Sequence, residues 1–211
     1  VGLRYPVKQI AAMAREKGVE FVAVDAAQTP GMIPVNCTEM GVDVLSTSGH
    51  KWLGGPKGTG LAFVSKRIHD SLQPMWVTWG QARWSDSARK YEDYGTRNSP
   101  EILTLEAAVR YQFQIDPVER ETRLQELWSF TRELVQRSKN LKWGSPTDWE
   151  LSGSLYSIRI DAPAAAVARS LYTRHQIVVR PYTNLGLNNL RVSPNVYSSK
   201  GQVQRLVGKL G

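Results

Sequence analysis

The residues best suited to chemistry lie in segment 46–60, which reads STSGHKWLGGPKGTG. It follows a short apolar run and combines hydroxyl groups, a histidine, two lysines and several glycines. Glycines let the backbone approach a ligand closely, and hydroxyl groups with a histidine can bind a phosphate. The spacing is not that of a Walker A loop, and a dinucleotide-binding turn would lead into a helix rather than the strand predicted here. The segment therefore predicts a phosphate-binding loop of another kind.

Lys51 lies inside this segment, where a lysine suggests carbonyl chemistry. Its amine could form a Schiff base with an aldehyde cofactor, the usual way to activate an amino acid at Cα. Such chemistry needs an acid that keeps the cofactor's pyridine nitrogen protonated. Asp25 follows the predicted strand 21–24, and strand ends form the sites of open α/β sheets. Taken alone, Lys51 is more simply a surface lysine, and Asp25 is as well explained as a helix cap.

Four ordered motifs resemble class V aminotransferases, fold-type I enzymes that use pyridoxal 5′-phosphate (PLP). They are VDAAQ at 24–28, SGHKW at 48–52 followed by GTG at 58–60, YGTRN at 94–98, and LRVSPNVY at 190–197. The family includes cysteine desulfurases, isopenicillin N epimerase-like proteins and related C–S lyases. None of the motifs is sufficient alone, but the ordered set is specific, and the resemblance extends from Leu3 onward.

The resemblance implies a role for each matched residue near the cofactor. Lys51 would form the internal aldimine and later shuttle the proton at Cα. Asp25 would pair with the pyridinium nitrogen, and Gln28 would hydrogen-bond the phenolic oxygen. Ser48 and His50 would bind the phosphate. Each has a simpler alternative, such as a structural role for the histidine or a turn for the glutamine.

Two further matches imply partners. Thr96 would reach the phosphate of the neighbouring subunit's cofactor, which implies a homodimer with shared active sites. Arg191 would bind the α-carboxylate of an amino-acid substrate with its two-pronged guanidinium group. The alternatives are a turn residue for Thr96 and an ion pair with a structural acid for Arg191.

The cofactor does not determine the reaction, because it supports transamination, racemisation, decarboxylation and elimination alike. Cysteine desulfurases of this superfamily carry a nucleophilic cysteine shortly before the carboxylate-binding arginine. Segment 173–190 contains none, and Cys37 lies early in the chain, where it is expected to be a buried small residue. We therefore expect an enzyme of the isopenicillin N epimerase-like branch. The alternatives are a PLP-dependent C–S lyase, a desulfurase-like enzyme, or, from another class, a non-catalytic scaffold or basic binding module.

The order of the expected elements indicates an α/β fold. Residues 1–112 are expected to form part of a fold-type I large domain, a three-layer α/β/α structure with a mainly parallel sheet. Residues 113–211 are expected to form a smaller α+β domain. The helices are expected at 6–17, 34–40, 100–115 with Ser99 as cap, 118–138, 163–174 and 198–210. The strands are expected at 21–24, 42–47, 61–64, 154–160 with one exposed face, 177–180 and 190–193.

Composition narrows the function classes. The chain has 211 residues, and 27 Lys and Arg against 19 Asp and Glu give a net charge of +8. These charges are scattered, without a zinc-finger spacing or an RNP-type motif, so no nucleic-acid partner is expected. No apolar run approaches the roughly 20 residues of a membrane span, so no membrane partner is expected. A single cysteine excludes an internal disulfide framework and a multi-cysteine metal site, and a reducing, cytoplasmic setting is expected.

The position of Lys51 suggests that more of the enzyme precedes this sequence. In fold-type I enzymes the lysine follows most of the large domain, whereas here it comes early, and the sequence begins at Val1 rather than a methionine. The chain is therefore expected to be the C-terminal part of a longer enzyme. The missing N-terminal part would complete the cofactor site.

Overall fold

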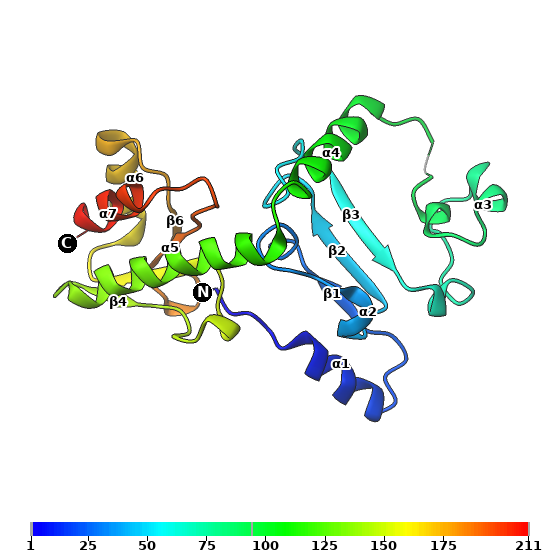
Figure 1. Ribbon diagram of the computed structural model, residues 1–211, viewed down its shortest axis with the longest axis horizontal. Helices are drawn as coiled ribbons and strands as arrows, with labels where there is room; N and C mark the ends of the chain where they lie inside the picture. Colours follow the sequence, from blue (N-terminus) through cyan, green and yellow to red (C-terminus); the bar gives the residue numbers. More distant parts are fainter. Residues whose placement is uncertain (1, 94, 211) are drawn as a thin grey trace. The chain divides into compact units, whose positions relative to one another are not determined.

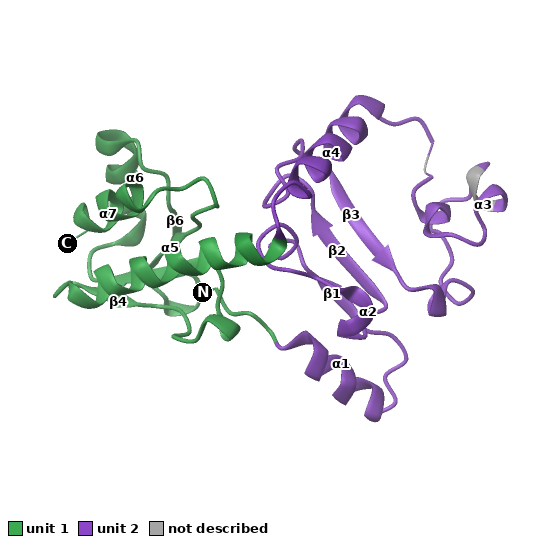
Figure 2. Ribbon diagram, viewed as in Figure 1, with its two compact units in different colours: residues 1–5, 117–211 green, residues 6–116 purple. Residues whose placement is uncertain are grey.

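The computed structural model describes residues 2–93 and 95–210 of the chain. They form two compact units, and Figure 2 colours each one: unit 2 comprises Pro6–Asp116, and unit 1 comprises Val1–Tyr5 with Pro117–Gly211. The sequence places the boundary after residue 112, whereas the contacts place it after Asp116 and join the first five residues to the later unit. Each unit is described by itself below.

Unit 2 is an α/β structure in which helices and strands are interspersed along the chain (Figure 1). Its regular elements are α1 (Val7–Glu16), β1 (Ala23–Asp25), α2 (Cys37–Met40), β2 (Val44–Ser48), β3 (Gly60–Val64), α3 (Gly80–Arg83) and α4 (Ser99–Gln112), with short 3-10 helices at Lys66–Ile68 and Ala88–Tyr91. The α/β fold predicted from the order of elements is confirmed. The cap predicted for α4 is wrong, because Asn98 occupies the N-cap position and Ser99 is the first helical residue.

The sheet of unit 2 has the order β1-β2-β3. β1 pairs parallel with β2, and Asp25 lies opposite Ser46; β2 pairs antiparallel with β3, and Ser48 lies opposite Gly60. The apolar sequence of β1 predicts a buried strand, but Ala23 and Asp25 are exposed. The reason is that Val24 packs against the core, so Ala23 and Asp25, which alternate with it, lie on the opposite face of the strand.

Apolar side chains from β2 and the adjoining loops form the core of unit 2. Ala26, Val42 and Leu45 are buried at its centre. Val7 of α1 and Met40 of α2 pack against them, so these two helices share one face of the sheet. Burying such side chains stabilises the fold by roughly 1.5–3 kcal/mol for each large one.

A buried carboxylate, Asp43, lies just before the first residue of β2 and accepts hydrogen bonds from several segments of unit 2. Asp43, 2% exposed, accepts hydrogen bonds at Oδ1 from Arg67 Nε at 3.0 Å and Nη2 at 2.7 Å. Its Oδ2 accepts from the backbone N–H of Val22 at 2.8 Å and from Arg15 of α1. Burial raises the pKa of this carboxyl, but the hydrogen bonds from Val22 and the two arginines outweigh it, so the net pKa lies below its ordinary value.

Replacing Asp43 with asparagine is expected to lower the free energy of unfolding at pH 7 by about 1.5–3 kcal/mol, because hydrogen bonds to a charged acceptor are lost. The folded-state pKa is depressed, so the carboxylate stabilises the fold above about pH 4, the ordinary value, and loses this effect as the pH falls through the folded-state pKa. Urea unfolding at pH 7 and pH 2.5 checks this: the difference between the wild type and the variant should be smaller at pH 2.5 than at pH 7. Asp70→Asn, at an exposed acid, is the control, and an equal difference at both pH values would contradict the ion-pair role.

Unit 1 is an α+β structure built on a four-stranded antiparallel sheet with the order β4-β5-β7-β6 (Figure 1). Its regular elements are α5 (Pro117–Arg137), β4 (Leu141–Trp143), β5 (Tyr156–Ile160), α6 (Ala164–His175), β6 (Arg180–Tyr182), β7 (Asn189–Val192) and α7 (Lys200–Gly208), with short 3-10 helices at Trp149–Leu151 and Asn184–Gly186. β4 is not predicted by the sequence, and the strand expected at 177–180 begins only at Arg180.

The exposed face predicted for β5 is observed only in part, because Arg159 is exposed while Ser157, on the same face, is buried. Tyr156, Ser157 and Ile158 are each at most 1% exposed. β5 lies between β4 and β7, and the Tyr156 hydroxyl lies 2.6 Å from Thr131 Oγ1 of α5. The helix α5 therefore covers the apolar face of β5, whereas Ser157 on the other face donates to the carbonyl oxygen of Gly144 at 2.8 Å.

Across the residues that the structure describes, no helix combines the length and the apolar character needed to cross a membrane.

Candidate active site

The ends of two parallel strands bring the first site residues to one edge of the sheet in unit 2. Asp25 is the last residue of β1 and Ser48 is the last residue of β2. The two strand ends are tied by the Thr47 hydroxyl, which donates to the carbonyl oxygen of Ala26 at 3.0 Å. Ligands of open α/β sheets bind at this carboxyl edge.

Lys51 lies in the turn that joins β2 to β3, and glycines fix the path of this turn. Gly49 N–H donates to Thr59 O at 2.9 Å, and Gly55 N–H donates to Gly49 O at 2.8 Å. A Cβ atom at Gly49 would lie 2.6 Å from Thr59 Oγ1 and 2.8 Å from Leu105 Cδ1 of α4. The loop therefore packs closely against α4, and the Lys51 side chain is exposed beyond it.

A hydrogen bond joins the segment after β1, at Gln28, to Trp52, the residue that follows Lys51. Trp52, 7% exposed, donates from Nε1 to Gln28 Oε1 at 3.0 Å. Gly31, at φ +88°, lies against the Trp52 backbone, where a Cβ would come within 2.7 Å of the carbonyl carbon. As an aromatic residue, Trp52 is expected from the sequence to be a packing or interface residue, and its burial agrees with packing. The sequence does not predict its hydrogen bond to Gln28. The feature of the sequence that could have pointed to Trp52 as a site residue is its position next to Lys51.

Several polar atoms at this edge are free to bind a ligand. Within the described chain, Lys51 Nζ and Ser48 Oγ make no hydrogen bond or ion pair. Asp25 Oδ1 accepts from Ala27 N–H at 3.0 Å, while Oδ2 has no such contact with the described residues. His50 Nδ1 lies 3.3 Å from Thr59 O; since a carbonyl only accepts, Nδ1 carries the hydrogen.

Thr96 is exposed in the segment that leads into α4. Asp93 orders this segment, because its Oδ1 accepts from Gly95 N–H at 3.3 Å and from Arg97 Nη2 at 3.4 Å. In the described part of the chain, no hydrogen bond joins Thr96 to the residues around Lys51. Tyr94, which opens the predicted motif, lies outside the described residues.

Arg191 belongs to unit 1, on β7, where it lies opposite Ser157 of β5 and Arg180 of β6. Its Nε atom is buried and has no hydrogen-bond partner. Among the described residues no acid forms an ion pair with it, so the alternative of a structural ion pair is not observed. Its guanidinium group has unused donors for an anion.

Cys37, the first residue of α2, is half-buried rather than fully buried as the sequence predicts. It contacts the core around Leu45 through its side chain. Burial raises the pKa of the Cys37 thiol. Its thiolate, the nucleophilic form of a cysteine, is therefore disfavoured.

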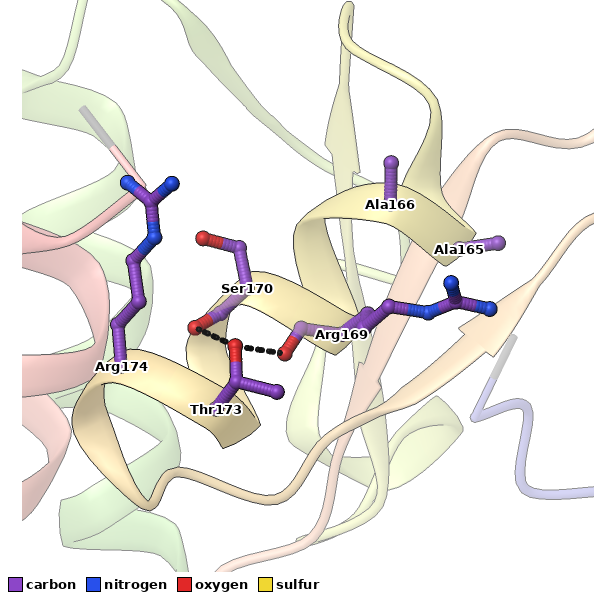
Figure 3. A pocket seen from close by; sticks show the side chains of 6 residues that line it. All are labelled: Ala165, Ala166, Arg169, Ser170, Thr173 and Arg174. Carbon is purple, nitrogen blue, oxygen red and sulfur yellow. Dashed lines mark hydrogen bonds between the residues drawn. The ribbon is translucent and has the colours of Figure 1, made fainter.

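A shallow depression with a volume of about 460 Å³ lies elsewhere, along α6 (Figure 3). Its lining residues all come from that helix: Ala165, Ala166, Arg169, Ser170, Thr173 and Arg174. The Thr173 hydroxyl donates to the helix's own carbonyl at Arg169, at 3.0 Å. Since no other element supplies a lining side chain, this depression is not a candidate active site. Over the described ranges, no group of three or more His, Cys, Asp or Glu residues could hold a metal ion.

A mixed sheet with a lysine, an aspartate and a glutamine at its carboxyl edge is the arrangement of a fold-type I PLP enzyme. The chain belongs to the class V aminotransferase family, whose model matches residues 1–206. It is 29% identical to an isopenicillin N epimerase from Amycolatopsis lactamdurans over 99% of this chain and 56% of that protein. The chain thus spans about half the length of the curated relatives it matches.

Solved structures share the fold. A cysteine desulfurase from Thermococcus onnurineus superposes with a TM-score of 0.85 at 25% identity, over 98% of this chain and 55% of that one. A C-DES variant with glycine covalently linked to its PLP cofactor superposes with a TM-score of 0.85 at 21% identity, over 97% and 56% of the two chains. The fold-type I assignment from the sequence motifs is confirmed.

Proposed function

We propose that this protein is a PLP-dependent enzyme that acts at Cα of an amino acid, in the isopenicillin N epimerase-like branch of its family. The supporting observation is that Lys51, Asp25 and Gln28 lie on segments tied together at one sheet edge. The similarity to isopenicillin N epimerase and the lack of a cysteine in segment 173–190 favour this branch over a desulfurase.

The free polar atoms at the edge fit the chemical groups of PLP. The Asp25 carboxylate holds the proton on the ring nitrogen, and the Gln28 amide donates to the ring oxygen. Ser48 Oγ donates to a phosphate oxygen, and a proton on His50 Nε2 lets the imidazole do the same. Lys51 Nζ would hold the aldehyde group of PLP and would move the proton at the substrate Cα. When bound, PLP supplies an electron sink for the bond broken at Cα.

Two residues are proposed to act on groups outside this edge. Arg191 binds the substrate α-carboxylate, consistent with its unpaired guanidinium donors. Thr96 donates to the phosphate of a second subunit's cofactor, so the working enzyme is a homodimer with shared sites. The exposed hydroxyl of Thr96 is available for this role.

Replacing Arg191 with alanine is expected to raise KM for amino acids by about 10²-fold, since a charge-assisted pair worth about 1.5–3 kcal/mol is lost. The affinity for PLP should change less than threefold. Steady-state kinetics and PLP titration measure the two effects, and Arg169→Ala, at an exposed arginine on α6, is the matched control. If KM for the amino acid and the Kd for PLP rose by the same factor, that result would argue against the carboxylate role.

The reaction itself is tested by incubating the PLP-loaded protein with a panel of amino acids in D₂O. Exchange of the Cα proton is expected for the proposed chemistry, and loss of optical purity without keto acid indicates epimerisation. Keto-acid formation without release of sulfur would instead indicate a transaminase, and pyruvate formed together with sulfide from cysteine or cysteine persulfide from cystine would indicate a C–S lyase. No PLP uptake and no exchange would favour the non-catalytic scaffold.

A further inference from the structure

We propose that Trp52 is a positioning residue that orients the Gln28 amide toward the cofactor, an inference that rests on the proposed function. Trp52 Nε1 donates to Gln28 Oε1 at 3.0 Å. An indole N–H can only donate, so the amide atom that meets it must be the oxygen. The hydrogen bond from the indole therefore determines which end of the Gln28 amide faces Trp52, although the two ends have nearly the same shape.

This orientation leaves the Gln28 NH₂ group as the available end. In the described part of the chain, Nε2 makes no hydrogen bond. A phenolate-type oxygen accepts hydrogen bonds, so an amide that presents NH₂ is complementary to it and an amide that presents oxygen is not. Without the indole N–H, the amide could rotate and expose either end.

The indole is well placed for this role because the surrounding chain is rigid. Trp52 is 7% exposed, and its backbone lies against Gly31, which has no room for a Cβ. Gln112 Nε2 of α4 donates to the next carbonyl, Leu53 O, at 3.1 Å. Since Trp52 directly follows Lys51, the same fixed peptide places both the amine and the group that orients the amide.

The experiment uses the full chain and compares Trp52→Phe, Gln28→Ala and the double variant, each titrated with PLP. Phenylalanine keeps the buried ring but removes the N–H. Trp52→Phe is expected to raise the Kd for PLP about fivefold, the loss of one hydrogen bond. It should also change the ratio of the visible absorbance bands that report whether the ring oxygen is protonated. In the Gln28→Ala background, Trp52→Phe should add less than a twofold change, because coupled residues are not additive.

Trp149→Phe is the matched control. Trp149, 9% exposed, also donates from Nε1 to a distant side-chain oxygen, Glu121 Oε1, at 3.1 Å. This variant loses the same kind of bond but should keep the wild-type spectrum and Kd. An unchanged spectrum in Trp52→Phe, or effects of Trp52→Phe and Gln28→Ala that simply add, would overturn the positioning role. Failure of the wild type to take up PLP would instead overturn the proposed function.

Discussion

Replacing Lys51 with alanine is expected to abolish both turnover and the visible absorbance that the PLP-loaded protein should show. The structure leaves this amine exposed and unpaired among the described residues, at the sheet edge that carries Asp25 and Gln28. Among the polar groups described at this edge, which also include Asp25, Gln28, Ser48 and His50, a primary amine is the one that can both bind an aldehyde carbon and move a proton at Cα. Residual turnover should be at least 10³-fold below wild type, a loss of about 4 kcal/mol in transition-state stabilisation.

Lys57 offers the matched control for this prediction. It is an exposed lysine in the same glycine-rich loop, six residues further along the chain. Lys57→Ala should keep the spectrum and at least half of the turnover. A Lys51→Ala protein that keeps the wild-type absorbance with PLP bound would show that another amine attaches the cofactor.

The second large effect is expected for Asp25. Replacing it with alanine removes the charge that keeps the ring nitrogen protonated, and turnover should fall by about 10²–10³-fold, the size typical of one lost electrostatic contact at the reacting centre. Because Asp25 is exposed at the end of β1, the fold itself should be little affected. Stopped-flow and steady-state assays measure the loss, and circular dichroism checks the fold.

Three further variants sharpen the Asp25 experiment. Asp25→Glu retains the charge and should recover more activity than Asp25→Asn, which retains only the shape. Asp161→Ala removes another exposed aspartate that directly follows a strand, β5, and should leave turnover unchanged. If Asp25→Asn worked as well as Asp25→Glu, the charge would not be the property that matters.

Local patterns in the sequence predict much of unit 2. Apolar runs place the strands within a few residues, and Asp25 is at the end of β1 as predicted. Lys51 lies in the predicted turn because glycines at 49, 54 and 55 allow a path that other residues would block. These features depend on short stretches of chain, which is why the residues alone indicate them.

Features that depend on distant neighbours are not predictable in this way. The burial of Ser157 on β5 depends on its neighbours Gly144 and Asn189, not on the alternation of the strand. The choice between Asn98 and Ser99 as cap depends on where the backbone turns, and both residues suit the position. The bond from Trp52 to Gln28 joins side chains that are 24 residues apart and needs the strands to be paired first.

The parallel pairing of β1 and β2 also has a consequence for folding kinetics. The bond between Gln28 and Trp52 closes a loop of only 24 residues, and the entropy cost of closure grows by just about 0.6 kcal/mol for each doubling of loop length. Proteins rich in contacts of short sequence separation fold faster than those that depend on distant pairings. The edge that holds Asp25, Gln28 and Lys51 is closed within one continuous stretch of chain, so it adds little to the contact order of the fold.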